Sequence, residues 1–199
     1  LGAEIDRSLR YGHPLVVILA DVDLLKAFND AHGHQAGDAA LAEVGSVLMK
    51  CLRSSDTVAR IGGDEFAIIL PETQLEAAGR EVIGYRVIGH RAIGGDAVSV
   101  AQRVLAALAE RDDIGVSLSL GLAALDPAEP TTRRIVHDAD AALYRAKADG
   151  GRSVAVSSPE ALRAPSCVED LAVVSSRMRP ETTATSGGPA PVGFQRQTG

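Results

Sequence analysis

The stretch Ala59-Arg-Ile-Gly-Gly-Asp-Glu-Phe-Ala-Ile-Ile-Leu70 decides how the rest of the chain can be arranged. Apolar runs flank the tetrapeptide Gly62-Gly63-Asp64-Glu65, a pattern that predicts a β-hairpin with a tight turn. Glycines at the turn permit positive φ and let another molecule approach the backbone closely. Asp64 and Glu65 place two carboxylates where the chain re-enters a strand. A Gly-Gly-Asp sequence by itself is better explained as an ordinary turn, so its meaning depends on the residues around it.

A second acidic pair follows the most continuous apolar run of the chain. Residues 15–20 are all apolar, which is typical of a strand covered on both faces. The run ends in Asp21-Val22-Asp23, and the two-residue repeat of a strand places Asp21 and Asp23 on the same face. Because a buried strand end rarely carries two acids without a cation, we expect at least one of them to bind a metal ion. Capping of the next helix by Asp23 is the alternative.

The remaining periodicities predict alternating helices and strands. Helical patterns precede Gly12 and then cover 26–32, 37–52, 101–108 and 131–149, while strand patterns cover 57–61, 66–70, 116–122 and 154–156. The strict alternation over 116–122 predicts a strand with one buried face. This order of elements predicts an α+β (α/β) fold, an antiparallel sheet of about five strands flanked by helices.

Two segments depart from this regular pattern. Glycines recur through residues 83–97, where we expect a mobile insertion that interrupts a helix beginning near Leu75. Beyond Ser157 the chain is rich in Pro, Ser, Thr and Gly, so we expect a disordered tail over residues 158–199. Residues 1–157 should therefore form one folded domain.

Composition limits the classes of function. The 199 residues include 46% hydrophobic and 3% aromatic side chains and no Trp, so the core must be aliphatic. A formal net charge of −6 argues against a nucleic-acid partner bound through phosphate contacts. The two cysteines lie far apart, and Cys51 falls on an apolar helical stripe, which predicts a buried free thiol in a reducing cytoplasm.

Targeting and membrane signals are absent from the sequence. No apolar run is long enough to span a bilayer, so we expect no membrane segment and a cytoplasmic location. The chain begins at Leu1 already in helical rhythm, which we interpret as a fragment of a longer protein. An upstream sensor or regulatory domain, which could carry a membrane anchor, is then expected to be missing.

Four spaced motifs resemble those of the GGDEF family of diguanylate cyclases, over about residues 5–157. In chain order they are Asp21-Val-Asp-Leu-Leu-Lys-Ala-Phe-Asn-Asp30, Gly33-His-Gln-Ala-Gly-Asp38, Gly62-Gly-Asp-Glu-Phe66 and Asp140-Ala-Ala-Leu-Tyr-Arg-Ala-Lys147. A single five-residue match is weak, whereas four in the correct order are specific. The resemblance implies the fold of nucleotide cyclases and polymerase palms. It also implies an enzyme that joins two GTP molecules into cyclic di-GMP and releases pyrophosphate, with one GTP on each subunit of a homodimer.

The resemblance further implies a metal and catalytic set. Asp21, the Val22 carbonyl and Asp64 would bind Mg²⁺, with Mn²⁺ as an alternative, because these are hard oxygen ligands. Glu65 would either activate the attacking hydroxyl or complete the metal coordination, and both roles remain open.

Substrate-binding residues follow from the same motifs. Lys26 and Lys147 match the family's phosphate-binding cations, and Asn29 and Asp38 match the pair that reads guanine, an amide and a carboxylate suited to that base edge. Gly62 and Gly63 would let the backbone lie against the nucleotide. Taken one at a time, these residues also fit helix caps or solvated surface positions.

An inhibitory site is also implied. Arg53-x-x-Asp56 stands before the signature at the spacing of the family's product-inhibition site, where a basic and an acidic residue bind cyclic di-GMP. Arg103 is a candidate partner from a later helix. The alternative is an exposed salt pair at a helix end.

The sequence departs from the family pattern in two places and leaves other functions open. Leu24 and Leu25 replace the aromatic residue that usually precedes the lysine. Family members often carry an arginine soon after the position of Lys147, and here Gly150-Gly151 place Arg152 one position later, which leaves its binding of phosphate open. A catalytically inactive GGDEF module that binds GTP or cyclic di-GMP and signals by protein contact is the second hypothesis. A related cyclase that makes another nucleotide is the third. The intact acidic and phosphate-binding residues favour the active diguanylate cyclase.

Overall fold

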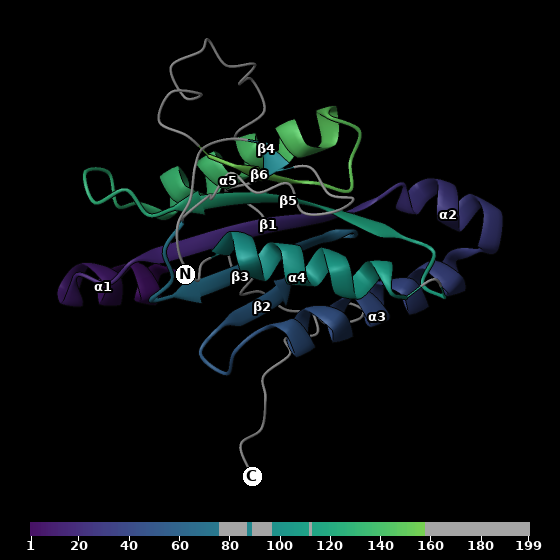
Figure 1. The fold of residues 1–199 in the computed structure, drawn as a ribbon, viewed down its shortest axis with the longest axis horizontal. Coiled ribbons are helices and arrows are strands. Elements are labelled where there is room, and N and C mark those ends of the chain that lie inside the picture. The colour runs from purple at the N-terminus through teal and green to yellow at the C-terminus, as the bar shows by residue number, and fades with distance from the viewer. Residues whose placement is uncertain (76–86, 89–96, 112, 158–199) are drawn as a thin grey trace, which may run out of the picture.

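The strand β1 (Leu15–Asp23) is the centre of the fold in a computed structural model that describes residues 1–75, 87–88, 97–111 and 113–157 (Figure 1). It lies inside a six-stranded sheet of order β2-β3-β1-β5-β6-β4. The other elements, in chain order, are α1 (Gly2–Tyr11), α2 (Leu25–His32), α3 (His34–Cys51), β2 (Thr57–Arg60), β3 (Glu65–Pro71), β4 (Val87–Ile88), α4 (Ala97–Ala109), β5 (Ser117–Ala124), α5 (Thr132–Ala148) and β6 (Val154–Val156).

The sheet confirms the predicted architecture and adds a parallel edge. β1 pairs antiparallel with β3 and β5, and β2 pairs antiparallel with β3. By contrast, β6 runs parallel to β5, and β4 runs parallel to β6. The connection from β5 to β6 explains the difference. α5 carries the chain back along β5, so β6 begins at the same end of the sheet as β5, and such a crossover joins parallel strands.

Helices cover both faces of the sheet. Val16, Ile18 and Ala20 of β1 pack in one apolar cluster with α3 and α4, whereas Val17 and Leu19 pack in a second cluster with α1 and α5. Figure 1 shows α5 on one side of the strands and α3 and α4 on the other. The two-sided cover confirms the prediction drawn from the continuous apolar run of β1.

Strand β5 differs from its prediction because both of its faces are buried. Residues from Leu118 to Ala123 are all buried, including Ser119 at 0% exposure. Gly121 allows α5 to pack directly on the strand, since a Cβ there would overlap the backbone of Ala139 and Leu143. Of the serines that made the pattern look half polar, Ser119 is buried and Ser117 is half-buried, and both donate hydrogen bonds to Asp23.

Several element boundaries can be compared with their predictions. α3 begins at His34, earlier than predicted, so Gly37 and Asp38 lie inside the helix and Asp38 is not its N-cap. Gly12 ends α1 at φ 68°, and Thr131 caps α5 through a hydrogen bond from the Arg134 backbone N–H, as the sequence indicates. Cys51 is a buried free thiol, and burial raises its pKa.

Part of the predicted insertion is a strand. β4 falls within residues 83–97, and Ala97 begins α4, whereas residues 83–86 and 89–96 lie outside the described residues. The helix expected beyond Leu75, the tail over 158–199 and Cys167 lie outside them as well.

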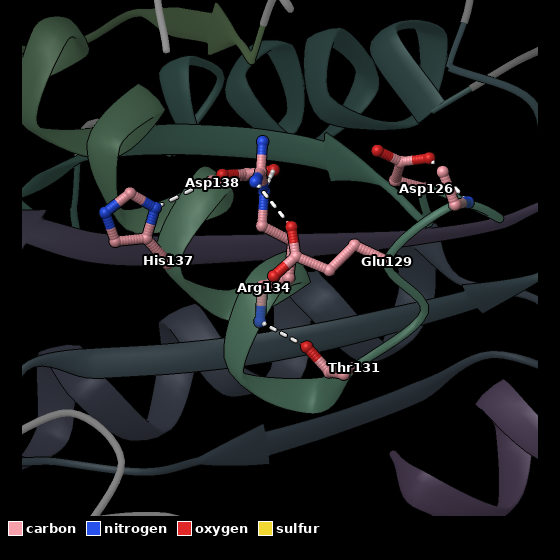
Figure 2. A network of polar contacts seen from close by, with 7 residues as sticks. Asp126, Glu129, Thr131, Arg134, His137 and Asp138 are labelled. Carbon is pink, nitrogen blue, oxygen red and sulfur yellow. Dashed lines mark hydrogen bonds and ion pairs between the residues drawn. The ribbon is translucent and has the colours of Figure 1, made fainter. Parts of the chain in front are cut away.

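A network of charged side chains fixes the start of α5 (Figure 2). Arg134 points between two carboxylates, donating from Nε to Asp138 Oδ2 and from Nη1 to Glu129 Oε2, both at 2.8 Å. His137 Nδ1 lies 3.2 Å from the other oxygen of Asp138, which is only 5% exposed. A buried carboxylate needs such partners, so the network ties the loop before α5 to the helix itself.

Candidate functional site

The predicted hairpin turn is present between β2 and β3. The backbone N–H groups of Ile61 and Gly62 donate to the Glu65 carbonyl at 2.9 and 3.3 Å. Contrary to the expectation of positive φ, neither Gly62 nor Gly63 adopts it. Gly62 instead leaves space for the Glu65 carboxylate, which a Cβ there would displace, whereas a Cβ at Gly63 would meet open space.

Arg60 braces this turn and was not singled out from the sequence. Its Nη2 donates to the Gly63 carbonyl at 2.6 Å, and its Nε lies 3.2 Å from the carbonyls of both Gly62 and Gly63. An arginine two residues before a Gly-Gly turn was the signal available. A single side chain at a strand end shows no periodicity from which its hydrogen-bond partners could be predicted.

The hairpin turn meets the acidic end of β1. The Val22 N–H donates to the Asp64 carbonyl at 3.0 Å, and Asp21 lies opposite Glu65 in the strand register. Two acidic motifs that are far apart in the sequence therefore reach the same end of the sheet. Asp21 is 6% exposed, so its carboxylate is largely removed from water.

Lys147, at the end of α5, is the positive partner of this acidic group. Its Nζ lies 2.7 Å from Asp21 Oδ2. Burial raises the pKa of Asp21; the hydrogen bond and charge of Lys147 act in the opposite direction, and the neighbouring Asp64 and Glu65 raise it further. The net effect is a raised pKa, so the folded chain resists placing a full negative charge here.

A pocket of about 610 Å³ opens beside this ion pair. The end of β1, one side of α2, the segment before β5 and the turn after α5 form its walls, with Asp21, Asp23, Lys147 and Arg152 among the lining residues. Of the predicted site residues, Asp21 and Lys147 line it. The other predicted site residues do not line it, namely Val22, Lys26, Asn29, Asp38, the turn residues 62–65, Arg53, Asp56 and Arg103.

The predicted guanine-reading pair lies where α2 meets α3. Asn29 is half-buried, and its Oδ1 is a buried side-chain atom with no hydrogen-bond partner among the described residues. That oxygen occupies the space beside Gly37, since a Cβ at Gly37 would overlap it. Asp38 follows on the exposed side of α3, and Lys26 is exposed in the first turn of α2.

The predicted inhibitory residues lie at the other end of β2 from the hairpin turn. The Arg53 backbone N–H donates to Asp56 Oδ2 at 2.8 Å, and the Ser55 hydroxyl donates to Oδ1 at 3.3 Å. Arg103 of α4 donates from Nη2 to the Cys51 carbonyl at 2.7 Å, which places it beside the end of α3. Arg53 is exposed, and its backbone forms the bond to Asp56.

Asp23 has a different role from the predicted helix cap. The N-cap position of α2 is Leu24, with no side-chain cap, and Asp23 instead accepts hydrogen bonds from Ser117, Ser119 and the backbone of Arg152. Sequence reasoning missed these three partners. The alternating serines of β5 were the only signal, and they reach Asp23 through the register of β1 with β5.

The donor set for a divalent cation is small. Among the described residues no group of three or more His, Cys, Asp or Glu side chains is gathered so that it could hold a metal ion. Asp21, Asp64 and the Val22 carbonyl offer two carboxylates and one carbonyl at one sheet end. Mg²⁺ commonly binds to one or two carboxylates and keeps several waters, so this set fits its chemistry.

Comparison with known proteins extends the similarity to whole domains. The family model described as "Diguanylate cyclase, GGDEF domain" matches residues 1–153. Diguanylate cyclase A of Treponema denticola is 32% identical over 149 residues, which cover 72% of this chain and 35% of that protein. Diguanylate cyclase DosC of Escherichia coli K12 is 37% identical over 151 residues, which cover 76% and 30%. The chain thus spans about a third of the length of these relatives.

Solved structures agree with the fold. The GGDEF domain of YfiN (TpbB) from Pseudomonas aeruginosa is 30% identical with a TM-score of 0.64, covering 79% of this chain and 91% of that one. The GGDEF domain of DgcB from Caulobacter crescentus, in complex with c-di-GMP, is 26% identical with a TM-score of 0.61, covering 78% and 84%. These likenesses confirm the predicted palm-like cyclase fold. Within the described residues, no helix combines the length and apolar character needed to cross a membrane.

Proposed function

This chain belongs to the GGDEF-domain family of diguanylate cyclases, and from that premise we propose that it condenses two GTP molecules into cyclic di-GMP. The 3′-hydroxyl of each GTP attacks the α-phosphate of the other, each new P–O bond replaces a bond to pyrophosphate, and two pyrophosphates leave. One observation carries the proposal. The Val22–Asp64 hydrogen bond and the Asp21–Glu65 register bring both acidic motifs to one sheet end, beside Lys147.

Asp21, Asp64 and the Val22 carbonyl would hold the divalent cation, Mg²⁺ or Mn²⁺. When bound, the cation supplies positive charge that stabilises the charge developing on the phosphates. Glu65 follows Asp64 directly, and its carboxylate could accept the proton of the attacking 3′-hydroxyl. The raised pKa of Asp21 supports the assignment, because a cation would offset the cost of its buried charge.

The substrate contacts are proposed from the residues that match the family motifs. Lys147 and Lys26 would bind the phosphates, and Asn29 with Asp38 would read the guanine edge. Asn29 supports this assignment, since its buried Oδ1 has no partner among the described residues, and turning the amide toward the base would recover a hydrogen bond. Gly62 and Gly63 carry no side chains of their own, so the nucleotide would be able to lie against the backbone of the hairpin turn.

Incubation of the purified chain with GTP and Mg²⁺, followed by chromatography for cyclic di-GMP, tests the proposal. We expect product from the wild type and none from Asp64→Asn or Asp64→Ala. Asp126→Asn is the matched control, since that exposed carboxylate lies in the loop before α5. A folded wild-type chain that makes no product at high protein concentration contradicts the proposal. Binding of GTP or cyclic di-GMP by that chain would then favour the inactive module.

We also propose that Arg53 and Asp56, with Arg103, bind cyclic di-GMP as an inhibitor. Two features support this: Arg53 is exposed, and its backbone N–H and the Ser55 hydroxyl hold the Asp56 carboxylate three residues away. Arg53→Ala should leave turnover intact and raise the inhibition constant for cyclic di-GMP about tenfold, the loss of one charge-assisted hydrogen bond. The readout is initial rate against added cyclic di-GMP, with the exposed Arg133→Ala as control. Unchanged inhibition in Arg53→Ala would remove the assignment.

A further inference from the structure

Three elements meet at the carboxylate of Asp23, the last residue of β1. Ser117 donates its hydroxyl to Oδ2 at 2.7 Å, and Ser119 donates its hydroxyl to Oδ1 at 2.6 Å. The backbone N–H of Arg152 donates to Oδ2 at 3.1 Å. Asp23 therefore joins the end of β1 to the start of β5 and to the turn between α5 and β6.

The turn that Asp23 holds has an unfavourable backbone conformation. Gly150, Gly151 and Arg152 follow one another with φ of 104°, 72° and 51°. Glycine adopts such values readily, but a residue with a Cβ does so rarely, so Arg152 needs a compensating contact. The Arg152 N–H bond to Asp23 is such a contact. Gly151 also packs against the same carboxylate, since a Cβ there would lie 3.0 Å from Oδ1.

This conformation places the Arg152 side chain in the pocket. Its Nε donates to the Ser117 hydroxyl oxygen at 3.2 Å, and Arg152 lines the pocket together with Lys147. The side chain thus rests on the same serine that donates to Asp23. The extra glycine that shifts Arg152 by one position along the chain does not remove it from the site.

We propose that Asp23 is a positioning residue, which holds the 150–152 turn so that Arg152 and Lys147 together receive a polyphosphate. The inference rests on the proposed function, because it assigns the triphosphate of GTP to this pocket. The two acids of β1 then have separate roles. Asp21 faces Lys147 and the acidic group of the hairpin, whereas the Asp23 oxygens already accept three hydrogen bonds from β5 and the turn.

The sign of one substitution separates positioning from simple electrostatics. Asp23→Asn keeps the shape of the side chain and removes a negative charge from a pocket proposed to bind an anion. If Asp23 acted only through its charge, Asp23→Asn would strengthen polyphosphate binding. If it positions the turn, the amide leaves a single acceptor oxygen for the donors Ser117, Ser119 and Arg152 N–H, so the turn is held less firmly and binding weakens.

The test is binding of 3′-deoxyGTP, which lacks the attacking hydroxyl, and of guanosine, which lacks the phosphates, measured by calorimetry with Mg²⁺ present. We expect Asp23→Asn to weaken 3′-deoxyGTP about tenfold and to change guanosine less than about twofold. Ser119→Ala should act in the same direction with a smaller effect. Asp30→Asn, which removes an equal charge from the exposed end of α2, is the matched control. Unchanged or tighter binding of 3′-deoxyGTP by Asp23→Asn overturns the proposal.

Two further measurements separate the remaining explanations. In an Arg152→Gln background, Asp23→Asn should weaken the binding of 3′-deoxyGTP little further, because its effect passes through Arg152. Full additivity of the two losses in binding free energy overturns the proposal. Titration with Mn²⁺ alone should show retained binding in Asp23→Asn and loss in Asp21→Asn. Loss of Mn²⁺ binding in Asp23→Asn would make Asp23 a metal ligand instead.

The outcome is also independent of catalysis. A chain whose 3′-deoxyGTP binding weakens in Asp23→Asn but that makes no cyclic di-GMP supports the inference and contradicts the proposed activity. A chain that binds no 3′-deoxyGTP contradicts the ligand assignment itself.

Discussion

Gly37 makes room for the side chain of Asn29, because a Cβ on Gly37 would overlap Asn29 Oδ1. Gly37→Ala should therefore displace the amide proposed to read guanine. Alanine is favoured over glycine inside a helix by about 1 kcal/mol, and the atom in the way is the end of a flexible side chain, so the helix should not lose stability. We expect the KM for GTP to rise about tenfold with no fall in Tm.

Steady-state kinetics with GTP, beside a thermal melt, checks this prediction. In an Asn29→Ala background, Gly37→Ala should change the KM little, because its target is already gone. An unchanged KM in the single variant would show that Asn29 does not contact the base.

The charge of Asp21 predicts a dependence of stability on pH. Since the pKa of Asp21 is raised above 3.8, chiefly by burial, the folded chain holds a proton that the unfolded chain releases first. Stability should therefore fall as pH rises from 3.8 through the folded pKa, and the penalty is fully present above it. Asp21→Asn lacks this penalty, so we expect it to be more stable than the parent chain at neutral pH, with a gap that narrows toward pH 3.8.

Chemical denaturation at several pH values without divalent cations measures this gap. A variant less stable than the parent at neutral pH would mean that the lost ion pair with Lys147 outweighs the relief of burial.

At the scale of single residues, the sequence predicted which residues belong to the candidate site better than it predicted which residues they contact. Asp21, Asp64 and Lys147 could be chosen because motif spacing carries them, and the structure brings Asp21 and Lys147 into an ion pair. The partners of Asp23 could not be chosen, because Ser117 and Ser119 reach it only through the register of two strands far apart in the chain. Register depends on the whole sheet and leaves no local signal.

At the scale of elements, α5 is the helix whose anchoring can be tested most directly. Arg134 joins Glu129 and the buried Asp138 at its start (Figure 2). Lys147 lies at the other end of the helix. Arg134→Ala should lower the free energy of unfolding by about 2 kcal/mol, because it leaves Asp138 buried without its strongest partner. Binding of GTP should be unchanged.

Urea denaturation and GTP titration provide the two readouts. Thr131→Ala is the comparison, since it removes only the helix cap and should cost about 1 kcal/mol. Equal losses in the two variants would show that the charged network adds nothing beyond capping.

Elements with a clear period were predicted well, and those without one were missed. The apolar run of β1 and the helical stripes of α3 and α4 carry enough residues to show their period. β4 has two residues, too few for any period to be seen, and it joins the sheet through parallel pairing with β6. The second buried face of β5 was missed because its serines are polar yet hydrogen-bonded inside the fold.

At the scale of the whole molecule, the sheet gathers motifs from both halves of the chain at one end. β1 and the β2–β3 hairpin supply the acids, and the end of α5 supplies Lys147. The proposed product, cyclic di-GMP, contains two guanylates, whereas the proposed set of metal ligands occurs once in the chain. A second copy is therefore needed to bring the second GTP, which makes the proposed reaction a property of a homodimer.

Dilution and subunit mixing test this requirement together. We expect the specific activity of the wild type to rise with protein concentration until dimers dominate. Adding a ninefold excess of Asp64→Asn chains, which should still fold and pair, would place most wild-type chains in mixed dimers, and activity per wild-type chain should fall to about one tenth. The same excess of a chain that does not pair should have no effect, as should the excess of Asp64→Asn if one chain carried out the whole reaction. Activity that is independent of both concentration and mixing would therefore place both GTP molecules on a single chain and contradict the dimeric site.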